Sequence, residues 1–200
     1  MIGAVVENMI GGFLHPRASV RRLLAGEHGL DAAIAMVLLA FLVRQILLVI
    51  TPGARPEELS AIPVGWYFSQ LVQLLFVFAL LSAVVYAVGR MFDGKGTFHQ
   101  SGLVIAWYLL VTSVIDPFAL VAWMQVSEAA RAAEAGGAEA VNIPAGAMLG
   151  LIACLIIATW LFASYVAELH RFASTWSVLG AVVGLSFLFS LVFSALMSSA

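Results

Sequence analysis

DAAIAMVLLAFLVRQILLVI, residues 31–50, is the stretch that decides the fold, because it is long and apolar enough to cross a bilayer. A hydrocarbon core of ~30 Å needs about 20 helical residues, and Arg44 is the one basic residue in the stretch. Four further stretches of similar length and character follow it along the chain. With the first, Asp31–Ile50, they predict five membrane-spanning helices, the others being Ile62–Val88, Ser101–Val126, Ala145–Val166 and Thr175–Met197.

The composition supports an all-α integral membrane protein. Hydrophobic residues make up 63% of the chain and charged residues 10%, whereas an average soluble domain is about 25% charged. A soluble protein of this size has too little interior to hide so much apolar surface. The net charge of −2 argues against a nucleic-acid partner, and the single Cys154 excludes both an internal disulfide and a zinc site built from thiolates.

Residues 1–30 are expected to form a cytoplasmic segment at the membrane surface rather than a removable signal peptide. A signal peptide carries its basic residues before its apolar core, and here Arg17, Arg21 and Arg22 come after the first apolar run. Apolar residues at helical spacing beside these arginines predict a short amphipathic helix that binds an anionic interface. The alternative is a helix that packs on the bundle itself. Residues 31–200 then form the five-helix transmembrane domain.

The distribution of Lys and Arg predicts the orientation, since positively charged short loops stay in the cytoplasm. With the N-terminus inside, the outer loops hold two basic residues, Arg55 and Arg131, and the inner regions hold six. This asymmetry predicts a cytoplasmic N-terminus and an external C-terminus. The inner basic residues are Arg17, Arg21, Arg22, Arg90, Lys95 and Arg171.

The polar breaks between the apolar stretches carry recognisable signals. Gly94-Lys95-Gly96 predicts a tight turn and lacks the spacing of a phosphate-binding loop. Thr97 and Gln100 predict a capping box at the start of the third helix. Later in the chain, an Ala/Glu/Arg-rich run predicts a short surface helix that ends at Gly136-Gly137.

Neither a catalytic site nor a cofactor is expected from the titratable residues. All four histidines fall on the predicted inner side, where Asp93 and Glu168 could complete a metal site. No two histidines have the i, i+4 spacing of a helical zinc pair, however, so contacts with lipid headgroups are the favoured interpretation. The histidines are His15, His28, His99 and His170.

A buried polar layer is predicted in the outer half of the bundle, centred on Arg44 and Asp116. An unpaired charge at this depth costs at least ~2.5–3.5 kcal/mol, so each residue needs a partner or water. We expect an Arg44–Asp116 pair, supported by Gln70, Gln73 or Thr112, with Pro117 loosening the third helix beside it. Three alternatives remain open: the pair locks two helices together, the residues belong to a transport path, or Arg44 extends to the headgroups.

The last apolar stretch carries small residues four positions apart. Such spacing lets helix backbones approach closely in lipid. Packing within the same bundle is the favoured interpretation, and a dimer interface is the alternative. These residues are Gly180, Gly184, Ser186, Ser190 and Ser194.

The stretch GRMFDGKGTFHQSGLVIAWYLLVTSVIDP, residues 89–117, resembles the central signature of the Yip family of polytopic membrane proteins. In that family a Gly/Lys-rich inner turn precedes an aromatic residue, a polar residue, and a helix with an aromatic pair and a later proline. ELHRFASTWSVLGAVV and FLHPRASVRRLL are similar to two further segments of the family, so the resemblance covers essentially the whole chain. The matching residues are Gly94, Lys95, Gly96, Phe98, Gln100, Trp107, Tyr108 and Pro117.

The resemblance implies a five-helix scaffold of the compact bacterial type, in the cytoplasmic (inner) membrane, whose partners are lipids, membrane proteins or further copies of the chain. GTPase binding, known for eukaryotic relatives, is not expected here, because the long N-terminal region with its Asp-Leu-Tyr-Gly-Pro motif is missing. The favoured function is therefore a non-enzymatic scaffold or adaptor. The alternative is a transporter or channel component with a polar path near Arg44 and Asp116.

Overall fold

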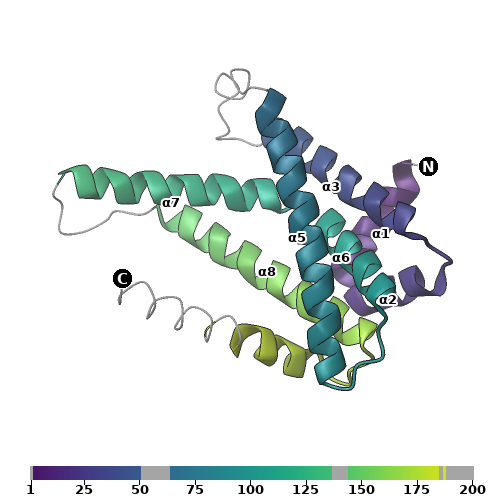
Figure 1. Ribbon diagram of the computed structural model, residues 1–200. Coiled ribbons are helices and arrows are strands. Elements are labelled where there is room, and N and C mark those ends of the chain that lie inside the picture. Colours follow the sequence, from purple (N-terminus) through teal and green to yellow (C-terminus); the bar gives the residue numbers. More distant parts are fainter. Residues whose placement is uncertain (1, 51–63, 137–143, 185–186, 188–200) are drawn as a thin grey trace.

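The computed structural model describes residues 2–50, 64–136, 144–184 and 187. In these segments the chain is helical between short turns (Figure 1). The helices are α1 (Ile2–Leu14), α2 (Pro16–Ala25), α3 (Leu30–Ile50), α5 (Val64–Met91), α6 (Phe98–Thr112), α7 (Asp116–Gly136) and α8 (Ala145–Leu169), followed by a helix over Thr175–Gly184.

Three helices of the described segments are long and apolar enough to cross a membrane: α3, α5 and α8. Each begins and ends within a few residues of the span that the sequence predicts. Large apolar side chains remain exposed along all three, for example Ile46, Phe76 and Leu155, each at least 62% exposed. Such surfaces are unfavourable in water and suit contact with lipid tails.

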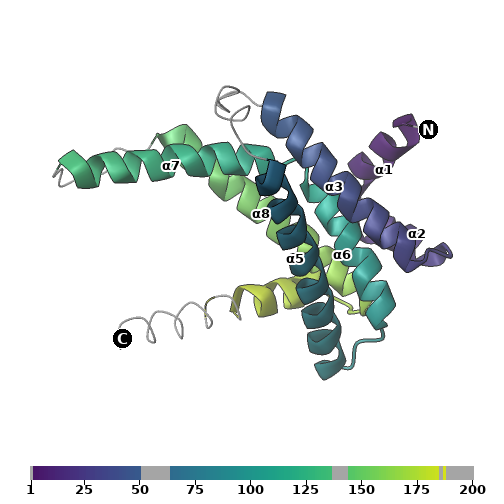
Figure 2. The same ribbon diagram turned by 45° about the horizontal axis from the view of Figure 1, so that its top comes forward.

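The third predicted span is not one continuous helix. The structure breaks it at residues 113–115 into α6 and α7, which together pass the test for a span but are bent by 62°. Pro117 explains the break, because a proline ring inside a helix clashes with the carbonyl four residues earlier and leaves it without a donor. α7 then continues through the Ala/Glu/Arg-rich run as far as Gly136, so this run is part of a long helix rather than a separate short one. Figures 1 and 2 both show α7 extending away from α3 and α5, while α8 packs against it.

The N-terminal region forms two helices where the sequence predicts one. The first helix ends at Leu14, and Pro16 opens the second, a position that proline tolerates because its missing N–H has no partner there in any case. The described part of the fifth predicted span, Thr175–Gly184, is helical. The rest of that span, apart from residue 187, lies outside the described residues.

α6 is the centre of the packing. It contacts α3, α5 and α8 as well as both N-terminal helices. Nine of its 15 residues are buried, among them Val104, Ile105 and Val111, which join Leu161 and Tyr165 of α8 in the larger apolar cluster. A second cluster joins Leu103 and Ala106 to α3. Because α6 touches so many elements, it fixes the positions of the turns at both of its ends.

Candidate functional site

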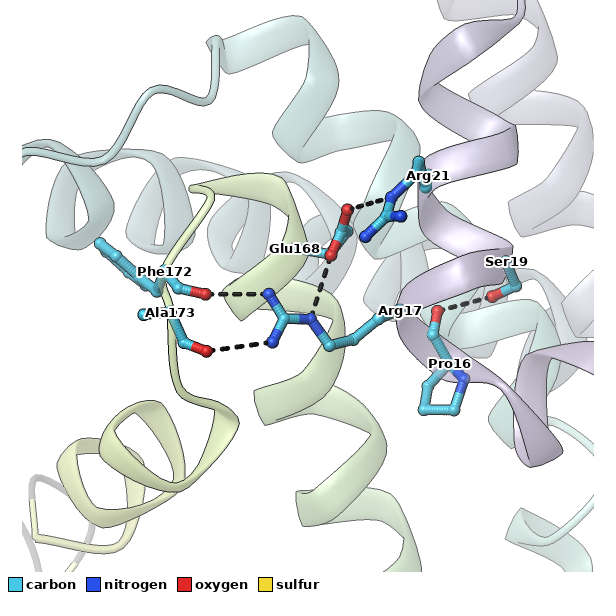
Figure 3. Close-up of polar contacts among 7 residues, drawn as sticks. All are labelled: Pro16, Arg17, Ser19, Arg21, Glu168, Phe172 and Ala173. Atoms are coloured by element: carbon cyan, nitrogen blue, oxygen red, sulfur yellow. Dashed lines mark hydrogen bonds and ion pairs between the residues drawn. The ribbon is translucent and has the colours of Figure 1, made fainter.

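The C-terminal end of α8 carries a carboxylate that holds the N-terminal region in place. Glu168 accepts a hydrogen bond from Nε of Arg17 at 3.0 Å and another from Nε of Arg21 at 2.8 Å (Figure 3). Both arginines reach the same carboxylate because residues four apart lie on one face of a helix. The Glu168 side chain is only 12% exposed, so the two cations compensate a charge that has lost most of its water.

Arg17 also closes the end of α8. Its Nη2 donates to the carbonyl of Phe172 at 2.9 Å, and its Nη1 donates to that of Ala173 at 3.4 Å. Figure 3 shows the guanidinium lying between Glu168 and these two carbonyls. One side chain of α2 therefore joins α8 to the turn that leads into the last helix.

His170, the residue after α8, lies in the interior rather than at a headgroup level. Its side chain is 2% exposed, and its Nε2 lies 3.1 Å from the carbonyl oxygen of Val85 in α5. The other ring nitrogen, Nδ1, is buried and has no hydrogen-bond partner. Burial lowers the pKa of His170, and the positive charge of Arg90 lowers it further. For this histidine the expectation of headgroup contact is wrong, because the ring fills a space that glycines of α5 and of the following turn leave open.

Contacts with His170 and Leu169 explain why glycines occur at the end of α5 and in the turn that follows it. A Cβ atom at Gly89 or at Gly94 would overlap the His170 ring, and at Gly96 it would lie 2.9 Å from Cγ of Leu169. Gly94 is buried and its N–H donates to the carbonyl of Gly89 at 2.8 Å, whereas Lys95 is exposed. The Gly-Lys-Gly motif is thus the surface against which His170 packs.

The two turns at this end of the molecule are built alike. Each contains a non-glycine residue in the left-handed region, Asp93 after α5 and Arg171 after α8, both with φ of 58°. Lys95 N–H donates to the carbonyl of His170 at 3.4 Å, which links one turn to the other. The contacts among α2, the end of α8 and the turns 92–96 and 170–174 are called the helix-end junction: α2 contacts Glu168 and the turn 170–174, and the turn 92–96 contacts His170.

Four residues of the predicted signature support the helices around this junction. The capping box is confirmed: Gln100 N–H donates to Thr97 Oγ1 at 3.2 Å, and Thr97 N–H donates to Gln100 Oε1 at 3.0 Å. Phe98 packs edge-on against Tyr86 of α5, with ring centroids 5.8 Å apart. The aromatic pair of α6 faces two helices: Trp107 Nε1 donates to Ser19 Oγ of α2 at 3.3 Å, while Tyr108 packs against Phe162 of α8 with centroids 5.4 Å apart.

The predicted polar layer is not assembled as a hydrogen-bonded network. Arg44 on α3 is within electrostatic reach of Asp116, the first residue of α7. Ion pairs are formed instead at Glu168, by Arg17 and Arg21. Thr112 donates to the carbonyl of Tyr108 in its own helix at 2.9 Å. Gln70 is half-buried on α5 and Gln73 is exposed, so the Arg44–Asp116 partnership stays a prediction.

The small residues of the last helix lie on an open surface in the part of the chain that the structure describes. No atom outside their own helix lies within 4 Å of a Cβ built at Gly180 or Gly184. Ser186, Ser190 and Ser194 lie outside the described residues. Packing within the bundle and a dimer interface both remain predictions.

Metal ligands do not gather anywhere in the described segments: no group of three or more His, Cys, Asp or Glu side chains there could hold an ion. Sequence reasoning named Glu168 and His170 as possible metal ligands and so missed their actual partners, the two arginines and the Val85 carbonyl. The available signal was the order of residues, since Glu168 and His170 follow closely after the predicted span Ala145–Val166, where the chain leaves the apolar stretch.

The comparison with known families agrees with the resemblance seen in the sequence. The model of the Yip1 domain matches residues 10–196, which is nearly the whole chain. The match spans α2, the signature turn and helix, and the helix-end junction. No curated protein and no solved structure matches the chain significantly. The chain therefore belongs to the Yip1 domain family.

Proposed function

We propose that this protein is a non-enzymatic membrane scaffold that organises lipids or partner proteins through the end of the molecule where the helix-end junction lies. The observation that carries the proposal is the convergence of three distant segments on Glu168 and His170. Such an arrangement holds a fixed surface made of α2 and two turns. A surface that is already ordered favours docking, because little conformational entropy is then lost when a partner binds.

The proposal includes five spans in the cytoplasmic membrane of a bacterium, with the N-terminus inside and the C-terminus outside. In this arrangement the bent pair α6–α7 counts as one span and residues 175–197 as the last. Support comes from the basic residues. Four basic residues belong to the helix-end junction, whereas Arg131 lies near the far end of α7. The four are Arg17, Arg21, Lys95 and Arg171. Gathering of cations at one end is typical of a cytoplasmic face.

The partners that we propose are membrane lipids, other membrane proteins or a second copy of the chain, with neither a nucleic acid nor a GTPase among them. The exposed side chains around the junction provide the chemistry for such contacts. Lys95, Phe98 and His99 are all exposed beside the turn after α5. A surface that combines cations with an aromatic ring suits anionic headgroups and acidic protein segments.

The test compares proteins and lipids that co-purify with the full chain when membranes are extracted with their lipids retained. Glu168→Gln removes the charge that holds both arginines, and Glu7→Gln is the matched control at an exposed position on α1. A scaffold predicts a reproducible set of associates that Glu168→Gln depletes and Glu7→Gln retains. An unchanged set in Glu168→Gln, or no reproducible set with the native chain, would contradict the proposal.

A transporter or channel component is the second candidate, and one observation favours it. The break between α6 and α7 places Asp116 at the start of a helix within the predicted third span. Broken helices of this kind form ion and substrate sites in transporters. Ion flux into proteoliposomes that is lost in Asp116→Asn would support this function. The scaffold proposal requires no such flux.

A further inference from the structure

Beyond the scaffold function, we infer that the cavity between α1, α2 and α6 is a binding site for a phosphate group. The cavity has a volume of about 180 Å³ and is lined by Asn8, Ser19, Arg22, Leu23, His28 and Trp107. Asn8, Arg22 and His28 are exposed, so the cavity is open to a ligand from outside the protein. The inference concerns a small ligand, and its test involves no protein partner.

The cavity lies on a different face of α2 from the helix-end junction. In Figure 3, Arg17 and Arg21 extend toward Glu168 from one side of α2, and Ser19 lies on the other side. Each residue turns a helix by about 100°, so Arg22 points away from Glu168. Loss of the junction and loss of the cavity are therefore separable by mutation.

The charge of the lining favours an anion. Arg22 carries a guanidinium, His28 carries an imidazole, and neither forms a hydrogen bond or ion pair with another residue of the described segments. None of the residues that line the cavity is acidic. A guanidinium with free N–H donors matches the geometry of phosphate oxygens.

Glycines make room for both of these side chains. A Cβ at Gly11 of α1 would lie 3.3 Å from Nη2 of Arg22, so the guanidinium rests closely on that glycine. A Cβ at Gly26 would overlap the ring of His28, which folds back over the end of α2. Both side chains are exposed at the rim of the cavity and lie against these glycines.

The polar groups at the floor of the cavity already have hydrogen-bond partners within the protein. Ser19 is buried; its hydroxyl donates to the carbonyl of Pro16 at 2.9 Å and accepts from Trp107 Nε1 at 3.3 Å. Ser19 and Trp107 therefore shape the cavity, while the donors left for a ligand are Arg22, His28 and the amide of Asn8. Three donors around a small space suit a phosphate, which accepts several hydrogen bonds at once.

A phosphate group reaches such a site either as a lipid headgroup or as a free anion, and the test separates the two. The full-length protein in neutral detergent is titrated with dioctanoyl phosphatidic acid, with inorganic phosphate and with dioctanoylglycerol, which lacks the phosphate. Native mass spectrometry gives the apparent Kd for each. We expect binding of the phosphatidic acid and not of dioctanoylglycerol. Competition by inorganic phosphate identifies a site that needs the anion alone, and lack of competition identifies a headgroup site.

Two variants test the assignment to this cavity. Arg22→Gln removes the charge, and Gly11→Leu keeps the charge but occupies the place of the guanidinium. Each should raise the Kd about tenfold or more, because a charge-assisted hydrogen bond is lost. Arg90→Gln, which removes an exposed cation elsewhere, should change the Kd by no more than about twofold, since salt screens distant charges.

The inference is overturned if Arg90→Gln weakens binding as much as Arg22→Gln does, because the attraction is then general. It is also overturned if Gly11→Leu binds like the native chain, or if the native chain binds neither phosphate probe. Thermal unfolding of each variant in the same detergent shows whether it is folded. If Gly11→Leu does not fold, His28→Gln replaces it, with the same expected weakening and the same contradicting result.

Discussion

Nε2 of His170 lies 3.1 Å from the carbonyl oxygen of Val85, so the residue that ends α8 is hydrogen-bonded to the interior of α5. In a helix the carbonyl of Val85 is the acceptor for the N–H of Gly89, the same glycine that makes room for the ring, and a carbonyl oxygen can accept both hydrogen bonds. Position 89 therefore determines how closely α5 and α8 approach. This relationship leads to the first two predictions.

Gly89→Ala should destabilise the protein, although alanine is the better helix former. The added Cβ overlaps the His170 ring, and overpacking of a buried contact costs about 1–3 kcal/mol. Gly150→Ala in α8 is the matched control, because a Cβ there meets nothing within 4 Å. Thermal unfolding in detergent should give a lower Tm for Gly89→Ala and an equal or higher one for Gly150→Ala. Equal Tm values for both variants would contradict the packing described for His170.

Stability should fall as the pH drops below about 6.5, the pKa of a histidine in an unfolded chain. Burial lowers the pKa of His170 in the folded state, so between the two pKa values the unfolded chain binds the extra proton and is favoured. The stability is fully present above about pH 6.5 and is lost as the pH approaches the folded-state pKa. Protonation would also place an N–H on the buried Nδ1, which has no acceptor.

Tm measured between pH 8 and pH 5 tests this dependence. His170→Gln should flatten the profile, because the titrating group is gone. His99→Gln, at an exposed position, should keep the slope of the native chain. A profile that stays steep in His170→Gln would assign the dependence to another group.

Arg17→Ala should destabilise more than Arg21→Ala, although both arginines bind Glu168. Arg17 makes two further hydrogen bonds to main-chain carbonyls, and its side chain is 36% exposed against 72% for Arg21. We expect a loss of about 1–2 kcal/mol for Arg17→Ala and a smaller, salt-dependent loss for Arg21→Ala. Chemical unfolding at low and high salt measures both. The reverse order would show that the carbonyl contacts of Arg17 contribute little.

Charge reversal tests the Arg44–Asp116 partnership. Arg44→Asp and Asp116→Arg should each lower the folded yield, because each leaves two like charges near each other in an apolar layer. The double variant should recover much of that yield. Size-exclusion profiles of the detergent-extracted protein give the measurement, and no recovery in the double variant would mean that the two residues do not pair.

Reporter fusions test the proposed orientation. A reporter after Ala200 should lie outside the cytoplasm, and one inserted at Lys95 should lie inside, as the distribution of Lys and Arg predicts. Fusions that report both termini on the same side would contradict the five-span arrangement.

The boundaries of α3, α5 and α8 could be predicted because length and hydropathy alone define a span, and the capping box because its two residues are local. The bend at residues 113–115 was harder to see. Pro117 is visible in the sequence, but only the packing of α6 and α7 decides whether a proline kinks a helix or ends it. The contacts of Glu168 and His170 join residues 85 to 151 positions apart. No periodicity or spacing in the sequence indicates pairs so far apart along the chain. The space beside Gly89 that the His170 ring fills is likewise evident only once the helices are placed.

The short length of α6 has a consequence for the surrounding bilayer. Its 15 residues extend about 22 Å, less than the ~30 Å of a hydrocarbon core. For a chain that crosses the membrane here, the remaining thickness is covered by α7, which runs obliquely because of the 62° bend. At this angle the 21 residues of α7 add about 15 Å of depth to an upright α6, so the two helices together reach across the core. The oblique helix occupies more area in one leaflet than an upright helix would, so the two leaflets around the protein hold unequal numbers of lipids.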